Sequence, residues 1–230
     1  MRTNEITAVL VHGAWADGSS WTQVIRKLHQ EGIKTVTPSI PLTTYADDVA
    51  ALDRALERVD GPTVVVGHAY AGAVIGGSRS DKVKGLVYVA ALAPDQGETV
   101  AEVFGRDTPH PQAPTLAPDA HGLLWLPERA FAEAFAQHAS AEEQAVLASL
   151  QRPLSPACIS VPMDRPRWHD LPSWYLLAER DRMIPRETQA FMAERMGATR
   201  HSHPLDHTPS VTAPALVAAL IRQAIDAVAH

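Results

Sequence analysis

The sequence has little of several features that mark other classes of protein. It contains one cysteine, Cys158, among 230 residues, which excludes an internal disulfide and is typical of a reducing cytosol. No stretch approaches the roughly 18 consecutive apolar residues of a membrane-spanning helix. Residues 1–5 carry no apolar segment with a cleavage site, so no secretion signal is expected. These absences predict a cytoplasmic protein that does not enter a membrane.

Clustered positive charge is missing as well. The formal net charge is −6 and no run of lysine and arginine occurs, which argues against nucleic acid as a partner. Hydrophobic residues make up 46% of the chain, enough to bury a large core. No internal repeat is visible. We therefore expect a single soluble domain spanning residues 1–230, and a homodimer is compatible with this composition.

A serine is missing where the pattern of one segment leads us to expect it. Residues 63–66, a threonine and three valines, predict a buried strand, followed by Gly67 and the small residues 71–73. Ala69 occupies the tip of the turn between them. A strand, a tight turn and small flanking residues are typical of the nucleophile elbow of α/β-hydrolases, whose usual pattern is G-x-S-x-G. A buried strand followed by an apolar helix without any catalytic role is the alternative interpretation.

The elbow segment departs from the usual pattern at two positions. Alanine at position 71 is a mild change because it is still small, whereas alanine at position 69 removes the nucleophile. His68 and Tyr70 flank the tip. Both neighbours are therefore candidates for the site, His68 as a substrate contact and Tyr70 as the donor of a main-chain N–H.

A second segment predicts the other half of an oxyanion hole. Thr7–Val11 forms a short apolar strand that ends at His12, Gly13, Ala14 and Trp15. A strand that ends in glycine and small residues leaves backbone N–H groups free at the edge of a sheet. We expect the Ala14 and Tyr70 amides to be the two donors, and Trp15 to contact ligand.

An acid and a base follow later strands. Ser173–Ala178 predicts a buried strand ending near Asp181, and a helical stretch over 187–196 leads on to His207. The chain order of nucleophile position, acid and base matches that of the hydrolase triad. In that arrangement Asp181 holds the imidazole in its tautomer, and His207 is the general base.

Other residues compete for these two roles. Glu179 is the alternative acid, although it belongs to the end of the strand, and His201 or His203 could replace the base. His207 is favoured because it lies where the chain enters its last predicted helix, Val211–Ala229. The histidines do not fall into a zinc-ligand spacing, so neither a metal nor a cofactor is expected.

Four motifs in this order resemble one group of proteins. They are L-V-H-G-A-W, V-G-H-A-Y-A-G-A-V, P-S-W-Y-L-L-A-E-R-D-R-M-I-P and D-H-T-P. They are similar to the small α/β-hydrolases that include plant methylesterases, hydroxynitrile lyases and bacterial carboxylesterases such as pyrethroid hydrolases. The resemblance implies a serine esterase with its nucleophile at position 69, acid at Asp181, base at His207 and oxyanion amides at Ala14 and Tyr70. Hydroxynitrile lyases carry lysine after the catalytic histidine, and Thr208 stands there, which favours ester cleavage.

The alternation of strands and helices predicts an α/β-hydrolase fold with a mainly parallel sheet and helices on both faces. Thr44 is expected to cap a helix running from Tyr45 towards Val59, and Val83–Ala90 to form the strand after the elbow helix. The alternation stops over residues 95–172, where proline is frequent. These residues are predicted to be an inserted cap, and residues 1–94 and 173–230 the core.

Parts of the cap region also have helical character. Helices are expected over Pro127–Phe135 and Ala141–Leu150, with inward-facing positions at residues 131, 135, 146 and 150. Substrate pockets are mostly apolar, so large apolar residues of this region are candidates for the pocket wall. The candidates are Leu123, Leu124, Trp125 and Trp168. Simple packing of the cap onto the core is the alternative for each.

Ala69 admits three interpretations. The favoured one is an engineered serine-to-alanine change that traps substrate or product, because the remaining site elements are still in register. The second is a natural ligand-binding protein or receptor. The third is an enzyme that uses only the dyad of His207 and Asp181. The expected partner is a small-molecule carboxylic ester, with a lactone, carbamate or amide as alternatives.

Overall fold

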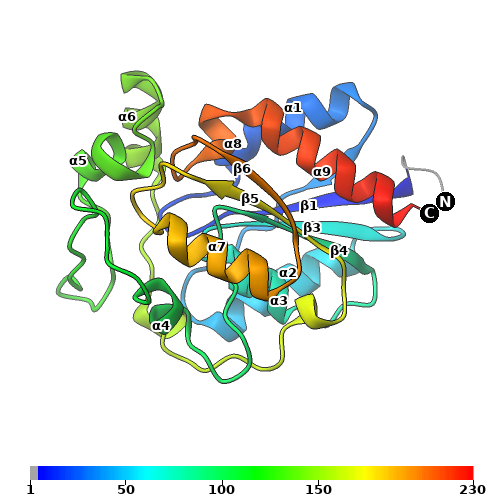
Figure 1. Cartoon of the computed structure of the whole chain (residues 1–230), viewed down its shortest axis with the longest axis horizontal. Helices are drawn as coiled ribbons and strands as arrows, with labels where there is room; N and C mark the ends of the chain where they lie inside the picture. The colour runs from blue at the N-terminus through cyan, green and yellow to red at the C-terminus, as the bar shows by residue number, and fades with distance from the viewer. Residues whose placement is uncertain (1–4, 230) are drawn as a thin grey trace.

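A parallel sheet forms the centre of the computed structural model, which describes residues 5–229 (Figure 1). Within that range six strands lie in the order β2-β1-β3-β4-β5-β6, and every neighbouring pair is parallel. The strands are β1 Thr7–Val11, β2 Lys34–Val36, β3 Thr63–His68, β4 Val83–Val89, β5 Ser173–Ala178 and β6 Thr199–His203. The predicted α/β-hydrolase architecture with a mainly parallel sheet is confirmed.

Helices cover both faces of the sheet. They are α1 Thr22–Gln30, α2 Tyr45–Glu57, α3 Ala71–Gly77, α4 Val100–Phe104, α5 Glu128–Ala130, α6 Ala141–Leu150, α7 Arg186–Arg195, α8 Pro209–Thr212 and α9 Pro214–Val228. Figure 1 shows α1 and α9 on one side of the sheet and α2, α3 and α7 on the other. No helix in the described range is long and apolar enough to cross a bilayer.

Alternation along the strands explains the two apolar layers. Successive side chains of a strand point to opposite faces of the sheet. Val64 and Val66 of β3 accordingly pack in one apolar cluster with α1 and α9, whereas Val65 packs in the other with α2, α3 and α7. A strand that is buried on both faces is apolar along its whole length. This is why β3 could be recognised from the sequence.

The strands end at one edge of the sheet and place the loops that follow them together. In a parallel sheet, ligand sites form beyond the carboxyl ends of the strands. The loop after β1 contains Ala14, the turn after β3 contains Ala69, and the loops after β5 and β6 contain Asp181 and His207. Residues far apart in the sequence thus meet at one edge.

One predicted helix start is confirmed and one predicted helix needs correction. Thr44 does cap α2, since its side chain accepts a hydrogen bond from the Asp47 amide. The predicted final helix over 211–229 is instead two helices, α8 and α9, separated at Ala213. Pro214 causes the break, because proline lacks an N–H and forces the preceding residue out of the helical conformation. Ala213 accordingly has φ −143° and ψ 50°.

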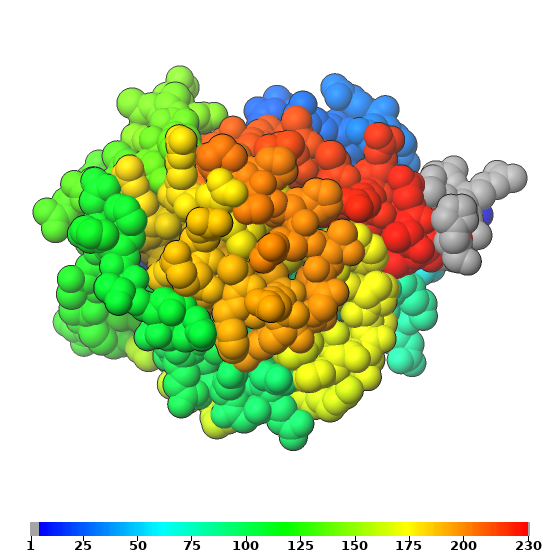
Figure 2. All heavy atoms as spheres, in the orientation of Figure 1, coloured from blue at the N-terminus to red at the C-terminus, as the bar shows by residue number. Residues whose placement is uncertain are grey.

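The residues predicted as the cap lie between β4 and β5. They contain α4, α5, a π-helical turn at Phe131–Phe135 and α6. The green part of this region forms the left side of the molecule in the space-filling view of Figure 2. Phe131 and Phe135 are buried as expected, but Val146 and Leu150 are 49% and 42% exposed. The inward placement of these last two was wrong, because the buried side chain of α6 is that of Leu147.

Candidate active site

The turn after β3 holds Ala69 in a strained conformation. Its φ is +50°, in the left-handed region that costs a residue with a side chain roughly 1–2 kcal/mol. The turn is fastened by hydrogen bonds: the Ala69 carbonyl accepts from the Gly72 amide at 3.1 Å and from the Leu92 amide at 2.9 Å. A Cβ at Gly67 would lie 2.7 Å from the Ala71 carbonyl oxygen, so only glycine allows the helix to begin this close to the strand.

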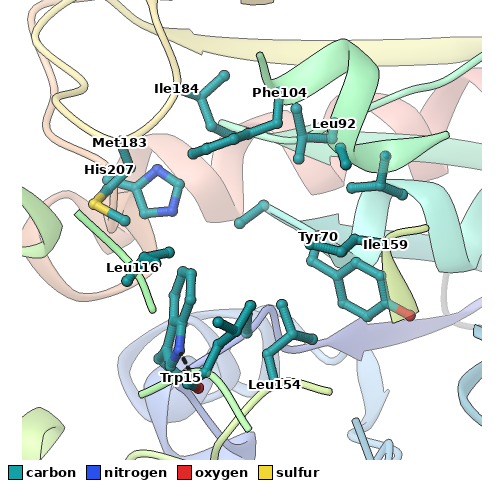
Figure 3. A pocket seen from close by; sticks show the side chains of 15 residues that line it. Trp15, Tyr70, Leu92, Phe104, Leu116, Leu154, Ile159, Met183, Ile184 and His207 are labelled. Carbon is teal, nitrogen blue, oxygen red and sulfur yellow. Dashed lines mark hydrogen bonds between the residues drawn. The ribbon is translucent and has the colours of Figure 1, made fainter. Parts of the chain in front are cut away.

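Ala69 lines an apolar cavity of about 120 Å³. The described wall also includes His207, which is its only residue with a titratable ring nitrogen, together with Ala14, Trp15 and Tyr70. Figure 3 shows the His207 imidazole, the Trp15 indole and the Tyr70 ring arranged around this space. The elbow tip and the imidazole therefore face one compartment.

The imidazole of His207 is oriented by a buried carboxylate. Its Nδ1 lies 2.8 Å from Oδ2 of Asp181, so the neutral ring carries its proton on Nδ1 and leaves Nε2 as an acceptor. The other oxygen of Asp181 accepts from the amides of Met183 at 2.7 Å and Ile184 at 2.9 Å. These donors hold the carboxylate in one orientation. Asp181 and His207 are thus brought together as the sequence predicted.

The competing acid and bases lie elsewhere. Glu179 is exposed and accepts from the Ser202 hydroxyl at 2.7 Å. His201 and His203 belong to β6, the edge strand, and neither lines the cavity.

Two main-chain amides next to Ala69 are available to a ligand. The loop after β1 passes against the elbow, because a Cβ at Gly13 would lie only 2.8 Å from the His68 carbonyl oxygen. Among the described residues, neither the Ala14 amide nor the Tyr70 amide has a hydrogen-bond acceptor. Both residues line the cavity. Free N–H groups in this position are suited to an oxygen that gains negative charge.

Comparison with known proteins agrees with this architecture. Residues 8–220 match the alpha/beta hydrolase family. The chain belongs to that family. This hydrolase is 30% identical over 118 residues to the carbendazim hydrolyzing esterase of Nocardioides sp. (strain SG-4G). That match covers 44% of this chain and 48% of the relative, so it spans about half the length of either protein.

Solved structures resemble the hydrolase over almost its whole length. A pyrethroid hydrolase from Sphingobium faniae JZ-2 has a TM-score of 0.82 and 23% identity, covering 96% of this chain and 98% of that one. The Arabidopsis methylesterase MES16 has a TM-score of 0.78 and 17% identity, covering 96% and 99%. At these identities the likeness establishes the fold, and these neighbours are themselves named as hydrolase and esterase.

The His68 side chain has a different place from the predicted substrate contact. It is buried and absent from the cavity wall. Its Nε2 donates a hydrogen bond to the His207 carbonyl at 2.6 Å. Burial, together with the nearby His207, lowers the pKa of His68 to about 3, so its ring is neutral. His68 therefore contacts the main chain of His207 and not the ligand space.

Three predicted wall residues also lie elsewhere, and Leu123 is not part of the cavity wall. Trp125 is 43% exposed and donates from Nε1 to Asp119 Oδ2 at 2.9 Å. Trp168 is buried, and its Nε1 donates to the Pro94 carbonyl at 3.4 Å. A buried tryptophan usually hydrogen-bonds through its N–H. For Trp168 the acceptor lies outside the cavity, so its ring packs there.

Trp15 and Leu124 do line the cavity, and they are joined. The Trp15 Nε1 donates to the Leu124 carbonyl at 3.0 Å, which links the loop after β1 to the cap region. The wall also contains residues that sequence reasoning missed, including Phe104, Leu116 and Ile159. The sequence around these residues is rich in proline and has no regular spacing of apolar residues, so no sequence signal distinguished them.

A buried carboxylate beside the elbow was missed as well. The Tyr70 hydroxyl donates to Asp48 Oδ2 at 2.7 Å, and the Leu42 amide donates to Asp48 Oδ1 at 2.7 Å. Burial raises the pKa of Asp48 and that of Tyr70, so Tyr70 stays a phenol. The side chain of Tyr70 is therefore anchored by Asp48 next to the elbow tip.

The titratable residues do not form a metal centre in the described range. No group of three or more histidine, cysteine, aspartate or glutamate side chains is placed to hold an ion between residues 5 and 229.

Proposed function

We propose that this hydrolase is built to cleave a small-molecule carboxylic ester with a serine at position 69. The Ala69 chain is then an inactive form, made by a serine-to-alanine change, that binds the ester and scarcely turns it over. One observation carries this proposal. The strained turn presents Ala69 to the same cavity as His207, whose Nδ1 is held by Asp181.

The backbone strain at Ala69 supports a nucleophile position. A residue with positive φ is retained only where surrounding contacts enforce it, and such residues cluster at functional sites. Glycine would relieve the strain at this position, since it adopts positive φ without a steric penalty. A strained alanine is the expected remnant of a strained serine, because the two side chains differ by one oxygen atom.

The proposed reaction follows from the positions of the groups. The hydroxyl of a serine at position 69 attacks the ester carbonyl while Nε2 of His207 accepts its proton. The Ala14 and Tyr70 amides bind the oxyanion of the tetrahedral intermediate. His207 then protonates the leaving alcohol, and the acyl group remains on the serine. Water, deprotonated by His207, hydrolyses this acyl-enzyme to the acid. The mechanism uses no metal or cofactor.

The apolar wall supports an uncharged substrate. Burial of a charged group without a partner costs roughly several kcal/mol. A carboxylate substrate would therefore bind poorly in this apolar cavity. The names of the relatives, an esterase, a pyrethroid hydrolase and a methylesterase, are consistent with an ester as substrate.

A second candidate is an enzyme that uses the dyad alone. The observation in its favour is that His207 and Asp181 are assembled in a chain whose elbow carries no hydroxyl. In this case His207 would be a general base for proton abstraction from the ligand. A ligand-binding protein without activity is the remaining alternative.

Reintroduction of the hydroxyl tests the proposal. Loss of a triad serine costs on the order of a million-fold in kcat, so Ala69→Ser is expected to increase p-nitrophenyl ester turnover by a similar factor. Rapid mixing should show a burst of p-nitrophenol equal to the enzyme concentration, and mass spectrometry should show the acyl adduct. The double variant Ala69→Ser/His207→Ala is the matched control and should show neither.

The outcomes separate the three functions. Absence of both burst and adduct in Ala69→Ser contradicts the esterase proposal. Turnover by the Ala69 chain that disappears with His207→Ala supports the dyad enzyme. Equal ligand binding by both forms, with catalysis by neither, supports the ligand-binding protein.

A further inference from the structure

A second hollow of about 230 Å³ adjoins the cavity. The two spaces share three wall residues, Phe104, Leu116 and Met183. We call the space at Ala69 the inner cavity and the second space the outer hollow. Because three residues belong to both walls, the two spaces are neighbouring compartments.

The outer hollow is apolar in its chemistry. Beyond the shared residues its wall consists of Pro109, Ala113, Pro114, Thr115 and Pro185. None of these described residues is charged, and Thr115 contributes the hydroxyl. Proline-rich walls keep their shape with little loss of conformational entropy on binding, because the ring fixes φ. The hollow therefore suits an uncharged, mainly hydrocarbon group.

The inner cavity is too small to enclose a whole ester of ordinary size. Its volume of about 120 Å³ is close to that of an apolar cavity of about 150 Å³ that binds benzene. Pockets for drug-sized ligands measure about 300–1,000 Å³. One half of such an ester fills the inner cavity, and the other half must extend beyond it.

The shared wall lies on the side of the catalytic imidazole. The Met183 amide donates to Asp181, the partner of His207, and Figure 3 shows Met183 and Leu116 next to the His207 ring. The leaving oxygen of the ester must come within hydrogen-bond reach of His207 to receive its proton. The alcohol half of a bound ester is therefore directed towards the outer hollow.

We infer that the outer hollow is the subsite for the alcohol portion of the substrate, an uncharged apolar group, while the inner cavity receives the acyl portion. The inference rests on the proposed ester hydrolysis and adds the direction in which the ester lies. It makes the wall residues Pro109, Ala113, Pro114 and Thr115 of the cap region determinants of specificity for the leaving group.

Two isomeric esters test the direction. Benzyl acetate carries its ring on the alcohol side and methyl phenylacetate carries it on the acyl side, with the same atoms in both. Ligand-detected NMR titration of the Ala69 chain measures the Kd of each intact ester. The variant is Ala113→Asp, which places a carboxylate in the wall of the outer hollow. The control is Gln112→Asp, which adds the same charge at an exposed neighbour outside that wall.

The expected result is selective. Ala113→Asp should raise the Kd of benzyl acetate at least about tenfold, because the ring would be buried against a charge, and change that of methyl phenylacetate less than about twofold. Gln112→Asp should change neither. Ala113→Trp, which fills the hollow with an uncharged ring, should also raise the Kd of benzyl acetate and leave that of methyl phenylacetate nearly unchanged. This result would exclude an effect specific to charge.

Kinetics in the Ala69→Ser background give an independent readout. The alcohol has left before deacylation begins, so Ala113→Asp should lower kcat/KM for benzyl acetate without changing the rate at which the acetyl-enzyme is hydrolysed. A changed deacylation rate would contradict the alcohol subsite.

The failures are distinguishable. If Ala69→Ser forms no acyl-enzyme from any ester, the proposed function fails and the assignment of an alcohol subsite fails with it. If acyl-enzyme forms but Ala113→Asp weakens both isomers equally, or methyl phenylacetate alone, the esterase stands and the assignment of the outer hollow is overturned.

Discussion

The imidazole of His68 is bonded to the main chain of His207, whose own ring is bonded to Asp181. His68 Nε2 donates to the main-chain carbonyl of His207 at 2.6 Å, while His207 Nδ1 meets Asp181 at 2.8 Å. The two histidine rings are 4.9 Å apart between centroids. His68, at the end of β3, thus connects that strand to the loop that carries His207.

Removal of this donor should destabilise the fold. In His68→Phe the buried His207 carbonyl loses its partner, which should lower the free energy of unfolding by about 1–3 kcal/mol. Urea denaturation at pH 7 measures the change. His203→Phe, on the edge strand, is the control and should change it by less than about 0.5 kcal/mol. Equal effects of the two substitutions would show that the bond to His207 contributes nothing specific.

Acid should destabilise the protein through two buried histidines. Burial lowers the pKa of His12 to about 4 and that of His68 to about 3, from an ordinary value of 6.5. At a pH between the folded-state pKa and 6.5, the unfolded chain binds more protons than the folded chain. The free energy of unfolding is therefore highest above pH 6.5 and decreases as the pH falls below it. The loss by pH 4 should be on the order of 3 kcal/mol for each histidine.

A variant isolates the share of one histidine. His12→Gln removes one titrating group, so its unfolding free energy should depend less steeply on pH between about 6.5 and 5 than that of the unchanged chain. The slope is compared, and not the absolute stability, because the substitution also changes packing. Identical slopes would show that His12 is not held neutral in the folded state.

Asp181 should be required for turnover in the Ala69→Ser background. Asn in this place no longer selects the Nδ1–H tautomer of His207, and a change of this kind costs about 10⁴-fold in kcat in a serine protease. We expect a loss of similar size for Asp181→Asn with p-nitrophenyl esters. The matched control is Glu179→Gln, the exposed carboxylate two residues earlier, which should keep nearly full activity. The reverse order of the two effects would move the acid to Glu179.

The buried carboxylate of Asp48 should be replaceable by its amide but not by a hydrocarbon. Because burial raises the pKa of Asp48, ionisation at neutral pH opposes folding, and Asp48→Asn removes that cost while keeping an oxygen for the Leu42 amide. Urea denaturation at pH 8 should show a change of less than about 1 kcal/mol. Asp48→Leu leaves Leu42 and Tyr70 without an acceptor and should lower stability by about 2–4 kcal/mol. Similar losses in both variants would contradict this account.

Several parts of the molecule were predictable because each has a local signal. β1, β3 and β5 are apolar on both faces, and each is followed by polar or small residues at the edge where parallel strands end. The meeting of Asp181 with His207 was predicted from their chain order, which matches that of the hydrolase triad. The catalytic roles assigned to these residues and to the amides of Ala14 and Tyr70 remain predictions until they are tested.

The cap region was predictable only in outline. Leu124 lines the cavity and its neighbour Trp125 is exposed. The main chain of Leu124 is bonded to that of Leu154, 30 residues later, a pairing that no local pattern reveals. Asp48 is similar, because its position in the first turn of α2 suggests a solvated acid. Its burial depends on Tyr70 and Leu42, which come from other parts of the chain.

The bond between Trp15 and the Leu124 carbonyl gives the chain a built-in optical reporter. The indole borders the inner cavity while its N–H is held by the cap region, so both the entry of a ligand and any displacement of the cap alter its surroundings. The emission of this one tryptophan is therefore expected to report occupancy of the inner cavity without a label. A Trp15→Phe variant identifies its contribution among the five tryptophans.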